Sequence, residues 1–291
     1  MTLLLMAVGV LAVSTSAPLI AVMTVPPLAI SFWRNGFATA LIAPTAALRR
    51  DELLGLGRDR FLMIGAAGLA LAVHFATWVT AVTMTSVASA TALVCLQIAW
   101  VAAYQMLRGT RFDRGVLAGL LVAFAGVLVV SGVDLSLSVR ALTGDLLALV
   151  GGVAAAAYTL IGSRARQSVS TSTYTFVCYG LCALLLLLGC LASGQDLSGY
   201  PAEQWGLLVV AAVVAQLLGH SVFNHLLATT TPMLVSLALL LEVPGAALLA
   251  AGFLGQTPPA PALFGLVVIL AGMALVIVRN KAPLPEEPPV S

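Results

Sequence analysis

The stretch from Gln216 to Gly245, QLLGHSVFNHLLATTTPMLVSLALLLEVPG, consists of two strongly apolar runs joined by a Thr/Pro turn. Gln216, His220 and Asn224 in the first run are spaced at i, i+4 and i+8, which places them on one stripe of a helix. The second run holds Glu242 among almost wholly apolar neighbours. A carboxylate near a bilayer centre costs about 2.5–3.5 kcal/mol on insertion scales, so Glu242 is expected to face protein or water. The stretch predicts a polar interior inside a membrane-embedded helical protein.

The composition excludes a water-soluble fold. Of the 291 residues, 61% are hydrophobic and 8% are charged, whereas soluble domains are about 45–50% apolar and about 25% charged. The net charge is +2, and the basic residues fall in short loops, so no basic face for nucleic acid is expected. The four cysteines lie in apolar runs without His or carboxylate ligands at metal-binding spacing. We therefore expect neither a metal nor another cofactor.

Ten apolar runs are long enough to cross a bilayer, which takes about 20 residues. The first lacks a basic leader region and is interpreted as a retained helix rather than a cleaved signal. The shorter alternating segments of a β-barrel do not occur, so the predicted fold class is an all-α integral membrane protein. The predicted helices are 2–22, 27–48, 61–82, 87–108, 115–132, 145–164, 172–192, 204–227, 232–254 and 261–279.

The distribution of basic residues predicts the orientation. Eleven of the 13 Lys and Arg residues fall in the loops after helices 2, 4 and 6 and in the C-terminal tail. Positive residues favour the cytoplasmic side, so both termini are predicted to be cytoplasmic. The tail, residues 281–291, is rich in Pro and Glu and is predicted to be disordered.

A shift of 146 residues superimposes the two halves of the chain. It lays His74 on His220 and also pairs Gly126 with Gly272. Five helices per half invert the second half relative to the first, which is the inverted-repeat architecture of transporters. The predicted repeats are residues 1–134 and 135–280. Glycines recur on helices 5 and 10 at positions 115, 119, 126, 265 and 272, which predicts a closely packed scaffold pair.

Polar residues inside the predicted membrane segments are the candidates for function, because each is costly there. Glu242 is the candidate proton-titrating group, and Pro244 is expected to kink the helix beside it. Arg34 either pairs with Glu242 or binds a substrate carboxylate. For most of the others the alternative is plain hydrogen bonding or packing between helices. The substrate-binding candidates are Thr15, Arg34, His74, Trp78, Gln97, Trp100, Tyr104, Tyr158, His220 and Asn224; the proton-coupling candidates are Glu242 and His220.

The order of several short motifs resembles the EamA branch of the drug/metabolite transporter superfamily. These motifs are STSAPL, FWRNG, HFATW, TSVASATALVCLQIAW and GDLLALVGGVAAAAYTL, followed by LLGHSVFNHLL, TPMLVSLALLLEVPGAALLA and FGLVVILAG. The resemblance implies ten helices in two inverted repeats and a central cavity in a bacterial cytoplasmic membrane. It also implies export of small organic molecules, commonly coupled to protons. Family members often carry Gly-Glu at the ends of helices 4 and 9, where this chain has Gly109-Thr110 and Gly255-Gln256.

Three functions remain open at this point. A secondary transporter for amino-acid-like or drug-like solutes should contain one central cavity that touches His74, Gln97, His220 and Glu242. A passive channel would need a filter of carbonyls or like charges, and a membrane enzyme would need a convergent nucleophile or metal set; the sequence contains no such motif. The expected partners of a transporter are a small-molecule substrate, protons and the lipid bilayer. The chain could act as a monomer or a homodimer.

Overall fold

The computed structural model describes residues 1–132, 138–257 and 259–279, and each regular element in these ranges is a helix. The predicted tail, 281–291, lies outside the described residues. By length and composition, eight spans in this part of the chain could cross a membrane. They are α1 and α2 (Thr2–Ser14, Ser16–Ala21), α5 (Arg58–Val82), α6 and α7 (Val87–Val94, Gln97–Leu107), α9 (Val139–Ala165), α10 (Thr171–Ser193), α11, η1 and α12 (Ala202–Val210, Ala211–His220, Ser221–Leu226), α13 and α14 (Pro232–Leu239, Glu242–Leu254), and α15 (Ala260–Arg279).

Two further helices complete the ten that the sequence predicts. They are α3 (Pro27–Ala47), which carries the polar pair Arg34 and Asn35, and α8 (Arg114–Gly132), whose apolar part is shorter. A short helix, α4 (Arg50–Leu54), lies in the connection between α3 and α5. The prediction of an all-α membrane protein with ten helices in two five-helix halves is confirmed.

Three spans that the sequence predicts as continuous helices are interrupted in the structure. The breaks lie at Thr15, at Cys95–Leu96 and at Leu240–Leu241. Proline explains the third break, because Pro244 has no N–H for the carbonyl of Leu240. That carbonyl instead accepts a shorter-range bond from the Val243 N–H at 3.2 Å. The predicted kink beside Glu242 is therefore present, immediately before the acid.

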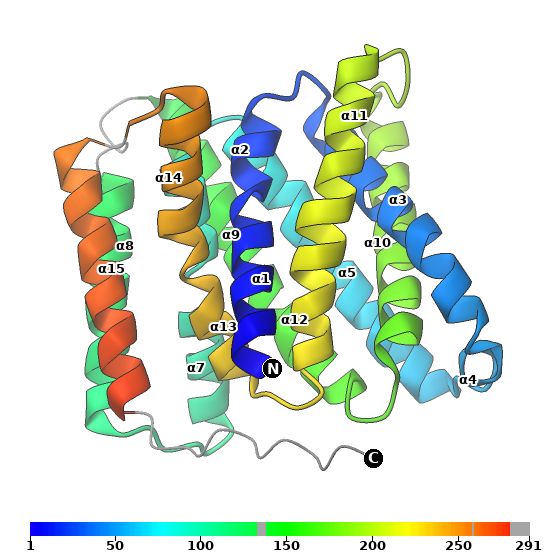
Figure 1. Cartoon of the computed structure of the whole chain (residues 1–291), viewed down its shortest axis with the longest axis horizontal. Helices are drawn as coiled ribbons and strands as arrows, with labels where there is room; N and C mark the ends of the chain where they lie inside the picture. Colours follow the sequence, from blue (N-terminus) through cyan, green and yellow to red (C-terminus); the bar gives the residue numbers. More distant parts are fainter. Residues whose placement is uncertain (133–137, 258, 280–291) are drawn as a thin grey trace.

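The helices α8 and α15 form a close pair at one side of the molecule (Figure 1). A Cβ added to Gly126 would lie 2.7 Å from the carbonyl oxygen of Gly265, and one added to Gly272 would lie 2.6 Å from that of Gly119. Only residues without a side chain allow the two backbones to approach so closely. The structure thus brings together the glycines from which the sequence predicted a scaffold pair.

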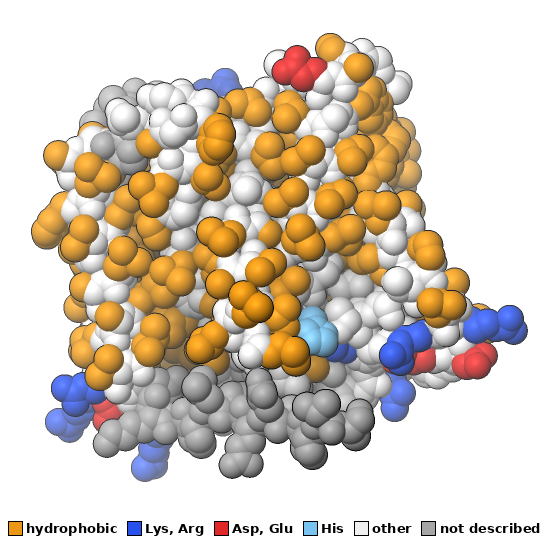
Figure 2. Space-filling model, viewed as in Figure 1, with side chains coloured by type: hydrophobic (Ala, Val, Ile, Leu, Met, Phe, Trp, Pro, Cys, Tyr) orange, Lys and Arg blue, Asp and Glu red, His pale blue; other side chains and the backbone are white. Residues whose placement is uncertain are grey.

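The surface fits a membrane-spanning protein. Figure 2 shows hydrophobic side chains over most of the visible face and Lys and Arg side chains gathered mainly along its lower edge. The N-terminus lies at the same edge (Figure 1). On the opposite side, Arg140 donates from Nη2 to the carbonyl of Thr83 at 2.9 Å. The side chains of the middle zone can therefore face lipid tails, while the charged groups lie at its borders.

Candidate solute-binding cavity

A central cavity lies between helices of both halves. Its volume is about 40 Å³, which is enough for a few water molecules. It is bounded by α2, α5, α6 and α7 from the first half and by α9, η1, α12, α13 and α14 from the second. The lining residues are Ser16, His74, Trp78, Val94, Cys95, Gln97, Ala155, Tyr158, Thr159, His220, Phe223, Asn224, Leu227, Val235, Leu239 and Glu242.

The two histidines that the 146-residue shift superimposes are neighbours in this cavity. The ring centroids of His74, on α5, and His220, at the end of η1, are 6.2 Å apart. Nδ1 of His74 lies 3.1 Å from the carbonyl oxygen of Gly151. A carbonyl can only accept, so Nδ1 carries a proton in this contact, and in the neutral ring Nε2 is then the acceptor. The cavity wall therefore contains an imidazole from each half.

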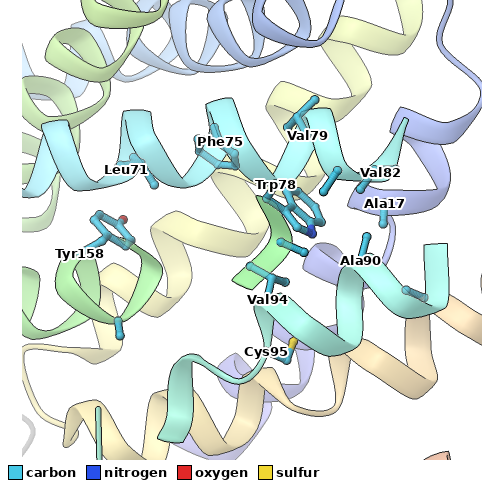
Figure 3. Close-up of a cluster of buried hydrophobic side chains, with 14 of the residues drawn as sticks. Ala17, Leu71, Phe75, Trp78, Val79, Val82, Ala90, Val94, Cys95 and Tyr158 are labelled. Atoms are coloured by element: carbon cyan, nitrogen blue, oxygen red, sulfur yellow. The ribbon is translucent and has the colours of Figure 1, made fainter. Parts of the chain in front are cut away.

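Trp78 extends the same wall by one helical turn. Its ring stacks on that of His74, with centroids 5.7 Å apart and an interplanar angle of 8°. Figure 3 shows its indole between α5 and α6, near Val94 and Ala90. The indole N–H is buried and has no hydrogen-bond partner in the described ranges. An unused donor beside the cavity can serve a polar group that enters it.

A hydrogen-bonded chain of side chains forms another part of the wall. The Tyr158 hydroxyl on α9 donates to Oδ1 of Asn224 at 2.7 Å, and Nδ2 of Asn224 donates to the Tyr179 hydroxyl at 3.0 Å. Nε of Arg166 donates to the Asn224 carbonyl at 2.9 Å. These bonds connect α9, α10 and α12, so the amide of Asn224 is held in one orientation.

Glu242 is the acid of the cavity wall. It is the first residue of α14, directly after the helix break, and is 8% exposed. Within the part of the chain that the structure describes, its carboxyl group has neither a hydrogen bond nor a cation within 4.0 Å. The carboxyl group is therefore free to interact with water, a proton or a solute in the cavity.

Arg34 lies behind the wall and is not within 4.0 Å of Glu242, the partner that was one of its two alternatives, although the two groups interact electrostatically. Its guanidinium is completely buried. Nε donates to Oε1 of Gln216 at 2.7 Å, and Nη1 donates to Oγ of Ser16 at 2.6 Å. The guanidinium also lies 4.5 Å above the ring of Phe75. Neutral acceptors rather than an acid thus hold this cation.

Seven of the eleven candidate residues line the cavity, and Arg34 contacts it through Ser16. Trp100 and Tyr104, which were predicted to form part of the cavity wall, do not line this cavity, and Thr15 forms the backbone bond that was the alternative to solute contact. The Thr15 hydroxyl donates to the Ala12 carbonyl of its own helix, Trp100 is 45% exposed, and Tyr104 bonds Arg164 in an exposed contact. The sequence pattern predicted a cavity position for the remaining seven, and the structure has them there; their roles in binding stay predictions. These seven are Trp78, Gln97, Tyr158, Asn224, both histidines and Glu242.

Sequence reasoning missed several groups. Ser16 lines the cavity, whereas from the run Ser14-Thr15-Ser16 only Thr15 was chosen as a binding candidate. Asp145, buried on α9, accepts from the Ser89 hydroxyl at 2.9 Å. An acid in an apolar helix was a usable signal for Asp145. No signal separated Ser16 from Thr15, because both hydroxyls precede the same proline.

Comparisons with known proteins agree with these observations. A sequence model of the EamA-like transporter family matches residues 1–132 and 142–278. A protein of Archaeoglobus fulgidus described as an uncharacterized transporter is 24% identical over 257 residues, which cover 87% of this chain and 89% of that protein. A solved structure, titled only as the crystal structure of a protein, superimposes with a TM-score of 0.73 at 18% identity, over 97% of this chain and 99% of the other. That likeness concerns the fold alone.

Proposed function

Because the chain belongs to the EamA-like transporter family, we propose that it is a secondary transporter that exports small organic solutes by alternating access around the central cavity. The chain is a multi-pass membrane transporter by family; the substrate class, coupling and direction are parts of the proposal. The observation that carries it is a central cavity between the helices whose polar wall comes from both halves of the chain. In the proposal the halves move relative to each other around this fixed site.

The size of the cavity favours a transport cycle over an open pore. A space for a few water molecules is too small for an organic solute. In the proposal, the present conformation is closed around the site, and a solute enters only after helices separate on one side. The wall offers apolar surface with a few polar groups, a mixture typical of sites for small organic molecules.

Glu242 is proposed as the proton-titrating group. Its carboxyl has no hydrogen bond and no cation within 4.0 Å in the described part of the chain, and the imidazoles of His74 and His220 line the same cavity. Acids and histidines within membrane segments are the usual elements of proton relays. In this proposal, the protein lies in a bacterial cytoplasmic membrane with both termini in the cytoplasm, and a proton gradient drives export.

The test is solute release from proteoliposomes that contain the full chain. The liposomes are loaded with a mixture of amino acids and other small metabolites, and release is followed with and without an imposed pH gradient. Release by the wild type should rise with the gradient. Glu242→Gln should keep gradient-independent exchange and lose the rise. Glu203→Gln, at an exposed acid in the first turn of α11, is the matched control. An undiminished response to the gradient in Glu242→Gln would contradict the role of Glu242, and absence of release by the wild type would contradict transport.

A further inference from the structure

The guanidinium of Arg34 has an unused donor in a place where charge is costly. It is wholly buried, and Nη2 has no hydrogen-bond partner in the described ranges. No carboxylate of the described chain lies within 4.0 Å of it, and Glu242 interacts with it electrostatically only from a longer distance. A buried cation without an acid in direct contact is destabilising unless another group compensates its charge. The compensating group can therefore be one that the chain itself does not supply.

Ser16 connects this cation to the cavity. Its hydroxyl oxygen accepts from Nη1 of Arg34 at 2.6 Å, and Ser16 lines the cavity. Because the oxygen is occupied as an acceptor, the hydroxyl hydrogen is available to donate elsewhere. The Ser16 hydroxyl donates to no acceptor among the described residues. A hydroxyl that is polarised by a guanidinium is a strong donor, because hydrogen bonds in such a chain strengthen one another.

The cation is held in a fixed position. Gln216 accepts from Nε of Arg34, and its own Nε2 donates to Oδ1 of Asn35 at 3.2 Å. Phe75 lies against the guanidinium, and the ring of Phe75 also contacts His220, with centroids 5.3 Å apart. The positive charge is therefore oriented before any solute arrives, which lowers the reorganisation cost of binding an anion.

We propose that the Ser16 hydroxyl, backed by Arg34, binds the carboxylate of the transported solute. The inference rests on the proposed transport function and specifies its substrate class, namely small organic molecules that carry a carboxylate. Arg34 acts here through Ser16 and through its charge, so it is a positioning residue. Glu242, in the same cavity wall, remains available for a proton or for a cationic group of the same solute.

The experiment uses proteoliposomes loaded with a defined mixture in which each carboxylate-bearing solute is accompanied by its carboxamide, together with amines and sugars. Mass spectrometry identifies what leaves. The wild type should release acids at least about tenfold faster than the matching amides, since a charge-assisted bond is worth that factor or more. Ser16→Ala and Arg34→Gln should lose this preference, and Arg34→Lys should retain part of it. Thr15→Val removes the neighbouring hydroxyl, whose bond stays within its own helix, and should keep the preference.

Each outcome decides between the two proposals. Release of solutes without preference for the carboxylate overturns this inference and leaves transport standing. Absence of release by the wild type overturns transport, and this inference falls with it. A preference that survives in Ser16→Ala overturns the assignment to Ser16. If Arg34→Gln slows the release of acids and of the matching amides equally, Arg34 has a structural role only, and its part in the proposal is overturned. If that variant does not fold, the release preference of Ser16→Ala decides the question.

Discussion

Sγ of Cys95 donates to the carbonyl oxygen of Leu239 at 3.3 Å, and this bond joins two helix breaks, one in each half of the chain. The 146-residue shift lays Cys95 on Leu241, so the breaks occur at matching positions of the repeats. Cys95 and Leu239 also line the cavity. Interrupted helices that meet at the centre of a membrane are found at the binding sites of many secondary transporters. A small change in helix direction at either break would therefore directly change the shape of the cavity.

Pro244→Ala should make the break before Glu242 less pronounced. Alanine supplies an N–H for the Leu240 carbonyl, and proline in a helix interior costs about 3 kcal/mol, so the free energy of unfolding should rise by up to that amount. The maximal rate of solute exchange should fall severalfold at unchanged apparent affinity, because this helix break acts as a hinge during transport and the substitution makes it stiffer. Pro27→Ala is the control, since Pro27 opens α3, where its missing N–H is not needed. An unchanged rate would argue against a hinge at this break.

Gly272→Ala should separate α8 from α15. Its Cβ would lie 2.6 Å from the Gly119 carbonyl oxygen, so one backbone must move. We expect a loss of about 1–3 kcal/mol in the free energy of unfolding, measured by denaturant titration in detergent. A Cβ at Gly252 meets no atom within 4 Å, so Gly252→Ala should be neutral or slightly stabilising. Similar effects of both substitutions would contradict the packing role.

Glu52 should make stability sensitive to acid. Its carboxylate accepts from the Ser170 N–H at 2.6 Å and from the Thr173 hydroxyl at 3.0 Å, and so joins α4 to the start of α10. Partial burial raises the pKa of Glu52, but the hydrogen bonds from Ser170 and Thr173 outweigh it and hold the pKa below 4.5. A lowered pKa in the folded state stabilises the fold above pH 4.5, and this contribution disappears as the pH falls through the folded-state value.

As the pH is lowered from 6, the melting temperature of the wild type should accordingly fall by more than that of Glu52→Gln. Both proteins are measured in the same detergent. Asp51→Asn is the control, because the Asp51 side chain is exposed and its carboxylate pairs with the exposed Arg50. Parallel acid profiles for the wild type and Glu52→Gln would refute the assignment.

Arg166→Gln should destabilise the junction of α9, α10 and α12. Arg166 donates to the carbonyls of Asn224 and Val169 and to the hydroxyl of Thr171. Losing these charged donors should lower the free energy of unfolding by about 2–4 kcal/mol. Arg164→Gln removes an exposed arginine two residues away, and its effect should stay within about 1 kcal/mol. Thermal unfolding of the two variants side by side measures the difference, and equal melting temperatures would contradict the prediction.

The sequence by itself determined the helix count, the two-half organisation and most of the polar groups in the cavity wall. Run length and composition decide which segments enter a membrane, and both are local properties. His74, His220 and Glu242 were identifiable because polar side chains inside such segments must avoid lipid.

Only the tertiary structure decided which side of each helix faces the cavity. Neighbouring residues of a helix point about 100° apart, so Ser16 lines the cavity while the adjacent Thr15 bonds within its own helix. A helix break alters the direction again, and of the three candidates on α7, Gln97, Trp100 and Tyr104, only Gln97 lines the cavity. The partners of Arg34 come from α2 and η1. Such contacts depend on how distant segments rotate and pack against one another, which local sequence patterns do not encode.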